Sequence, residues 1–127
     1  MSQYIIYFNQ QWVGDHSEEW FARRGPLAKA VVDEMRDAGV LIFAAGVDED
    51  PDAAITADGT GGTLEFRTGL YAPSEQFIGG LTMIDVVDEE AARMWGGRIA
   101  VACGRPQQIR QVLRLRSWRP HRECHGG

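Results

Sequence analysis

One carboxylate among apolar neighbours is the first candidate for proton-transfer chemistry. Asp85 shares a face of an expected strand with Leu81 and Met83, because side chains alternate along a strand. Removal from water favours the protonated form of a carboxyl group, which suits a general acid or base. The structural alternative is that Asp85 caps the helix that follows or pairs with an arginine. We take Asp85 as a candidate catalytic residue.

A histidine far upstream is the candidate partner of this carboxylate. His16 is the only histidine before Asp85, and an imidazole can take up or release a proton near neutral pH. It follows Asp15 at the expected start of a helix, where a solvated side chain is the ordinary interpretation. Asp85 and His16 together form the candidate catalytic pair.

A second set of side chains could bind a small anionic substrate: Tyr7, Arg67, Tyr71 and Ser74. Arg67 lies at the end of an expected strand and could hold a carboxylate with two parallel hydrogen bonds. A surface ion pair with Glu65 or Glu75 is its structural alternative. The phenols of Tyr7 and Tyr71 could donate to a ligand, although packing against a sheet explains them equally simply.

The metal-binding patterns in the chain are incomplete. His121, Cys124 and His125 are possible zinc ligands, but their spacing fits no closed four-ligand site. The segment 48–59 opens with alternating aspartates like a calcium loop, but it lacks glycine at the sixth position and glutamate at the twelfth. Cys103 lies on the apolar stripe of an expected helix and is interpreted as a packing residue. We therefore expect no metal and no cofactor.

The first elements that must position these residues are a strand and a long helix. Residues 4–8 are aromatic and β-branched, which predicts a strand. Asp15 with Glu18 fits a capping box, and Ser17 is a second possible helix cap. Gly25–Pro26 then predicts either one kinked helix or two short helices, because proline disrupts a helix beyond its first turn.

The rest of the chain predicts mainly strands. Expected elements are a strand over 40–45, a hairpin from 54–57 and 63–67, a strand over 78–87, a helix from Asp88 to Gly104 and a last strand over 107–115. An alternative ends this helix at Trp95 and makes 98–103 a strand. The last strand carries arginines 110, 114 and 116 on one face, which is either solvated or faces an acidic ligand or dimer mate.

The resulting fold class is α+β. With the inserted hairpin counted as one strand, the expected order is βαβββαβ; without it the order becomes βαββαβ, a ferredoxin-like layout with an extra β-hairpin strand. Two helices would cover one face of the sheet and leave the other face apolar. An apolar face of that size predicts a partner, most simply a homodimer through the open sheet face. We expect one domain over 1–116 and a flexible tail over 117–127.

Composition excludes several classes of protein. The chain has 127 residues, 44% of them hydrophobic and 24% charged, which is typical of one globular domain. Its net charge of −5 argues against nucleic acid as a partner. No apolar run approaches the roughly 20 residues of a membrane span, and the first residues do not resemble a signal peptide. Two cysteines exclude a disulfide scaffold. We expect a cytoplasmic protein.

Three segments carry a resemblance to a known family: 32–41, 68–81 and 84–91. Together they resemble YCII-related proteins of the DGPF group, in which an Asp-Gly-Pro-Phe loop leads to a Gly-Gly pair, a strand ending in Asp and a helix that opens with acids. Gly79–Gly80 and Asp85 match this pattern. Thr68 and Leu70 stand where the signature has Asp and Pro.

The resemblance implies a dimeric α/β barrel with a cleft near Asp85. YCII relatives are associated with a His/Asp pair whose histidine lies on the first helix, and His16 is not at the position that aligns with it. Two functions follow. One is cofactor-free lyase or isomerase-type chemistry on a small anion, with Asp85 as acid or base and His16, Arg67 and Tyr71 orienting the substrate. The other is a non-catalytic binding or regulatory accessory module of the sigma-factor-associated type. A third hypothesis is a heme- or oxygen-handling protein of the same superfamily. The lack of a well-placed histidine ligand counts against it.

Overall fold

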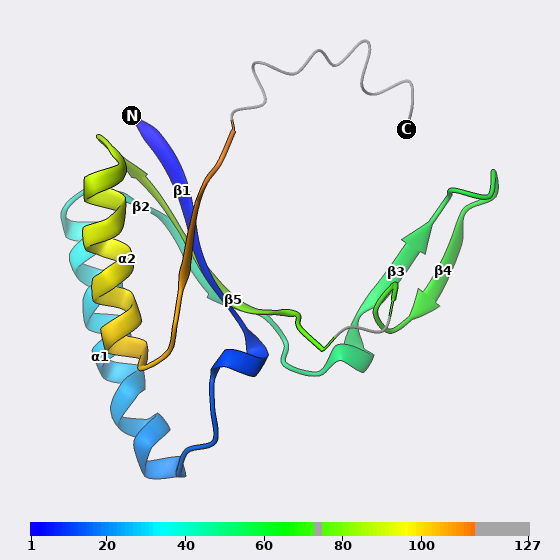
Figure 1. The fold of residues 1–127 in the computed structure, drawn as a ribbon, viewed down its shortest axis with the longest axis horizontal. Helices are drawn as coiled ribbons and strands as arrows, with labels where there is room; N and C mark the ends of the chain where they lie inside the picture. Colours follow the sequence, from blue (N-terminus) through cyan, green and yellow to red (C-terminus); the bar gives the residue numbers. More distant parts are fainter. Residues whose placement is uncertain (73–74, 114–127) are drawn as a thin grey trace.

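A four-stranded sheet with two helices on one face forms the body of the protein (Figure 1). The computed structural model describes residues 1–72 and 75–113. The strands lie in the order β2 (Leu41–Gly46), β5 (Ile78–Val86), β1 (Ser2–Asn9) and β6 (Gln108–Gln111), and every neighbouring pair is antiparallel. The helices are α1 (Glu18–Asp37) and α2 (Glu89–Cys103). The predicted α+β class is confirmed, and this arrangement is compatible with a ferredoxin-like fold.

The core lies between the sheet and the helices. Ile6 of β1 and Ile84 of β5 are fully buried on the helix-covered face, where they meet Met35 of α1 and Trp95 of α2. Each large apolar side chain buried in this way contributes about 1.5–3 kcal/mol. The period-two alternation of β5 therefore decides which of its side chains enter the core and which face away from the helices.

Helix α1 begins at a serine cap and is not interrupted. The Ser17 hydroxyl accepts a hydrogen bond from the Trp20 backbone nitrogen at 3.1 Å. Ser17, rather than Asp15, is thus the cap, and the expected Asp15–Glu18 box does not form. One helix continues through Pro26, so the two-helix alternative is wrong. Proline supplies no backbone N–H to the preceding turn, so one hydrogen bond of the usual helical pattern is absent there.

Helix α2 matches the longer of the two helices that the sequence allowed. The Asp88 carboxylate accepts from the Ala91 backbone nitrogen at 2.9 Å, and Gly104 ends the helix in the left-handed region with φ of 71°. The alternative strand over 98–103 is wrong. A Cβ atom on Gly96 would overlap the Ile109 side chain, so this glycine allows β6 to pack closely against the helix. Strand β6 is shorter than expected, and positions 114–127 lie outside the described residues.

The inserted hairpin does not extend the main sheet. Its strands β3 (Ile55–Asp58) and β4 (Glu65–Thr68) form a separate two-stranded sheet, whereas one extra strand was expected. Figure 1 shows this hairpin standing away from the body, on the side opposite the helices. Because strand faces alternate, Ile55 and Phe66 lie on one apolar face and are 75% and 68% exposed. No helix in the described part of the chain is long and apolar enough to cross a membrane.

Candidate functional site

Asp85 lies on the open face of the sheet, away from both helices. It alternates with Ile84 and Val86, which are buried on the helix-covered face, and it pairs with Gln3 of β1. Its backbone nitrogen donates to the Val40 carbonyl at 2.8 Å. Its Oδ1 atom is buried and has no hydrogen-bond partner among the described residues. The predicted strand position is confirmed, and the carboxylate does not cap α2.

His16 lies near the opposite end of the sheet. Its ring stacks on Trp20 at 3.6 Å between centroids and meets the edge of Phe21 at 6.0 Å. It precedes α1, close to the end of β1 at Asn9, whereas Asp85 lies beside Gln3 near the start of β1. Six residues of extended strand span roughly 20 Å. The structure therefore does not bring His16 and Asp85 together within one chain.

Arg67 and Tyr71 lie together, but on the projecting hairpin. The Arg67 guanidinium lies 3.8 Å from the Asp58 carboxylate and 5.6 Å from the centre of the Tyr71 ring. The alternative ion pair is therefore made with Asp58 rather than with Glu65 or Glu75, because Asp58 is its diagonal neighbour across the hairpin. The Tyr71 ring is exposed. Ser74 lies outside the described residues.

Tyr7 is engaged in packing on the open sheet face. Its hydroxyl donates to the Gln108 side-chain oxygen, and its ring stacks with Trp12 at 6.3 Å. It pairs with Leu81, four positions along β5 from Asp85. The predicted catalytic and substrate-binding residues therefore do not converge on one cleft within a chain.

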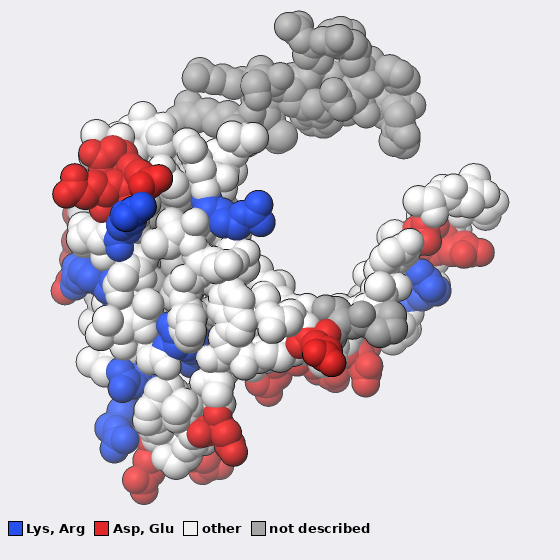
Figure 2. Space-filling view, in the orientation of Figure 1, with Lys and Arg blue, Asp and Glu red and all other residues white. Residues whose placement is uncertain are grey.

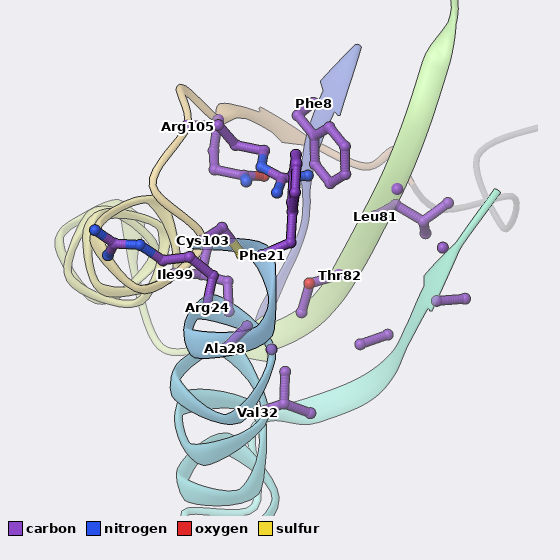
Figure 3. A pocket seen from close by; sticks show the side chains of 16 residues that line it. Phe8, Phe21, Arg24, Ala28, Val32, Leu81, Thr82, Ile99, Cys103 and Arg105 are labelled. Atoms are coloured by element: carbon purple, nitrogen blue, oxygen red, sulfur yellow. The ribbon is translucent and has the colours of Figure 1, made fainter. Parts of the chain in front are cut away.

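A pocket that sequence reasoning missed lies between the helices and the sheet (Figure 3). Its volume is about 400 Å³. The walls are mainly apolar and come from both helices and three strands. Side chains that define it include Phe8, Phe21, Ala28, Val32, Thr82 and Ile99. A concave, mostly apolar space with a few polar groups is the usual form of a small-molecule site.

Two glycines make room for the aromatic wall of this pocket. A Cβ atom on Gly80 would lie 2.7 Å from the Phe8 ring, and a Cβ atom on Gly79 would also lie 2.7 Å from it. Heavy atoms do not approach so closely, so the glycine pair lets the Phe8 ring lie against β5. The pair was visible in the sequence, but nothing local indicated that Phe8 would occupy the space above it.

Arg105 stacks on this aromatic wall. Its guanidinium carbon lies 4.6 Å from the centre of the Phe8 ring, and its Nε atom is buried with no hydrogen-bond partner within 1–72 and 75–113. Arg24 also contributes to the lining, but its Nη1 donates to the Val101 carbonyl at 3.1 Å and its charged end points away from the cavity (Figure 3). Of the two guanidiniums, that of Arg105 is available to a ligand.

Besides Gln107, two smaller polar groups line the pocket. The Thr82 side chain is buried, and Figure 3 shows its hydroxyl directed into the cavity. Burial raises the pKa of the Cys103 thiol above its ordinary value, although Arg105 and Arg24 act in the opposite direction. Cys103 is therefore a neutral thiol near neutral pH, in keeping with its predicted packing role.

A second pocket of about 500 Å³ adjoins the first. Phe8, Phe21 and Arg105 line both, so the guanidinium lies where the two meet. Glu49 lines the second pocket but forms no ion pair with Arg105. Among the described residues no three metal-ligating side chains gather into a group. Neither a scan against protein-family models nor a search of curated proteins finds a match to this chain.

Proposed function

We propose that the protein binds a small molecule, without catalysing a reaction, in the pocket between its helices and its sheet. The observation that carries this proposal is the 400 Å³ cavity with its glycine-supported aromatic wall. None of the described residues that line it is Asp, Glu or His. General acid–base chemistry in the pocket would lack its usual side chains, and this favours binding over catalysis.

Filling the pocket tests the proposal. Ala28 lines it, whereas Ala30 lies on the same helix and faces another groove. We expect phenylbutanol, a neutral probe with an apolar body, to raise the melting temperature of the wild type and of Ala30→Leu. It should have no effect on Ala28→Leu, in which the added carbons occupy the site. An equal response of both variants, or none in the wild type, would overturn the proposal.

We also propose that the open sheet face binds a second copy of the chain, closing a dimeric α/β barrel. Phe43, Met83 and Ile5 form one row across this face, and Arg110 extends it. Figure 2 shows few charged side chains on the surface that faces the hairpin. Asp85 and Arg110 have no ion pair within the described residues. A two-fold interface is self-complementary, so an acid and an arginine without ion pairs on the same face of one copy can pair with each other across it.

The mass in solution tests the dimer. Light scattering should give about twice 14.1 kDa for the wild type. Phe43→Asp introduces a charge into the proposed interface and should give a monomer. Val101→Asp, at an exposed position on α2, is the matched control and should remain a dimer. A monomeric wild type would contradict this proposal and leave the pocket proposal untouched.

Membership of a known family and acid–base catalysis by Asp85 are also proposals. Segments 68–81 and 84–91 support membership of the YCII-related DGPF group. The partnerless, buried Oδ1 of Asp85 favours acid–base chemistry as a second candidate function, in a cleft that a second copy would close. Carboxyl NMR with Asp85→Asn for assignment tests it. A titration midpoint well above the roughly 3.9 of a model aspartate would support acid–base chemistry, and a midpoint at or below that value would overturn this second candidate.

A further inference from the structure

We propose that the ligand of the helix–sheet pocket is an organic anion, a carboxylate on a compact apolar body, and that Arg105 binds its charged group. This rests on the proposed function and adds the chemical class of the ligand. The proposal rests on the Arg105 guanidinium, which lies at the pocket and whose buried Nε has no acceptor in the described part of the chain. Guanidiniums in such surroundings normally find carboxylate or carbonyl oxygens.

Arg98, a second arginine that stacks on an aromatic ring, has the ion pair that Arg105 lacks among the described residues. Arg98 stacks over Trp95 at 5.1 Å and also donates to the Glu34 carboxylate. Arg105 has the equivalent stacking on Phe8, at 4.6 Å, but no ion pair with any described acid. A ligand carboxylate at Arg105 would stand where Glu34 stands at Arg98.

The position of Arg105 is set before any ligand arrives. On one side, Arg105 contacts the Phe8 ring, which packs against Gly79–Gly80. On the other side, the preceding Gly104 adopts φ of 71° and a Cβ atom there would lie 2.7 Å from Trp20. The Arg105 backbone nitrogen donates to the Ala100 carbonyl at 3.3 Å. A preorganised guanidinium loses little conformational freedom on binding, which favours affinity.

The rest of the pocket selects the body of the ligand. Val32, Ile99 and Ala28 offer apolar walls, and the buried Thr82 hydroxyl offers one hydrogen-bonding group. Arg105 lies at the boundary with the second pocket. The carboxylate would therefore lie at this boundary while the apolar body extends between the helices and β5.

The test compares three probes that share a body and differ in charge: phenylbutyrate, phenylbutanol and phenylbutylamine. Calorimetric titration of the wild-type protein should give tighter binding of the acid than of the alcohol, by about tenfold to a hundredfold, and weaker binding of the amine. Arg105→Gln should lower the affinity for the acid to that for the alcohol and leave the alcohol unchanged. Arg105→Lys should keep a reduced preference for the acid, because it keeps the charge but loses the planar fork.

Two controls isolate the residue. Arg24→Gln should leave the affinity for the acid unchanged, because the Arg24 guanidinium already donates to Val101. Glu49→Gln should not weaken it either. Acid binding that is detectable only in Glu49→Gln would show that Glu49 is the partner of Arg105, and would overturn the inference. So would a loss of acid preference in Arg24→Gln rather than Arg105→Gln.

The outcomes separate this inference from the proposed function. If acid and alcohol bind the wild type equally and Ala28→Leu blocks both, the pocket binds ligands but the anion inference is wrong. If no probe binds, the proposed function fails and this inference fails with it. If the acid binds best, Arg105→Gln removes that preference and Arg24→Gln does not, the inference stands.

Discussion

The ring of Phe8 lies in the space that a side chain at Gly80 would need. A Cβ atom on Gly80 would come within 2.7 Å of the ring and 3.3 Å of the Ala45 carbonyl oxygen. Phe8 and Gly80 face each other directly across β1 and β5. This pair therefore links the sheet to the pocket, because the Arg105 guanidinium stacks on the same ring.

Gly80→Ala should lower the free energy of unfolding by about 1–3 kcal/mol, because the Phe8 ring must move from a packed position. It should also weaken phenylbutanol binding, since that ring is a wall of the pocket. Urea denaturation and calorimetry measure the two effects. Gly97→Ala is the control, with open space around it on α2, and should raise stability by up to about 1 kcal/mol. An unchanged Phe8 environment in Gly80→Ala would contradict the role of the glycine.

Gly96→Ala should destabilise the protein by about 1–3 kcal/mol, because the new methyl group would overlap Ile109 of β6. The cost should fall when Ile109→Ala is combined with it, since the obstructing atoms are then absent. A double-mutant cycle by urea denaturation measures this coupling. Additive effects of the two substitutions would show that the cost of Gly96→Ala arises within α2 and not at its contact with Ile109 of β6.

Ser17→Ala should cost about 0.5–2 kcal/mol, because the Trp20 N–H would lose its side-chain acceptor at the start of α1. Asp15→Ala should change stability much less, since the helix begins after Ser17 and not after Asp15. Thermal unfolding of the two variants measures the difference. The reverse ranking would show that the capping box forms in solution.

Cys103 should react slowly with iodoacetamide in the folded protein, because burial raises the pKa of its thiol. The reaction should accelerate only as the pH rises above the ordinary thiol range, and phenylbutanol should protect the thiol by occupying the pocket. The experiment uses Cys124→Ser, so that one thiol is followed. Because the unfolded chain ionises its thiol first, stability should fall as the pH rises through the ordinary thiol range. A folded-state rate equal to that in urea would contradict burial.

Asp58 should remain ionised at a lower pH than an ordinary aspartate. Hydrogen bonds from the Thr60 hydroxyl and backbone nitrogen, at 2.7 and 2.9 Å, lower the pKa of its carboxyl, and Arg67 adds to the effect. The stabilisation of the hairpin turn is therefore present above the ordinary aspartate pKa and is lost as the pH falls through the lowered one. In Thr60→Val, NMR titration should find the midpoint raised. An unmoved midpoint would contradict the hydroxyl contact.

The local features of the fold were predictable from the sequence. The alternation along β5 placed Asp85 opposite the buried Ile84, because a strand has a period of two residues. Asp88 and Gly104 marked the two ends of α2, because helix ends need a side-chain acceptor at one end and tolerate left-handed backbone at the other. Each of these signals acts over only a few residues.

The place of the hairpin relative to the main sheet was not predictable in the same way. Residues 54–57 and 63–67 were predicted to pair as a hairpin, and β3 and β4 do so, but the pattern does not say whether that hairpin joins the main sheet. In the structure they pair with each other and leave the main sheet four-stranded. Pairing depends on where the chain places the neighbouring edge, which no local pattern encodes.

The sequence by itself determined the α+β class, the two ends of α2 and the faces of β5, because those follow from local periodicity and hydrogen bonding. Only the tertiary structure decided which side chains meet. It separated His16 from Asp85 along the length of the sheet, and it placed Phe8, Gly80 and Arg105 together from three distant segments. The physical reason is that a pocket forms from contacts between elements, and those contacts exist only after the helices have packed on the sheet.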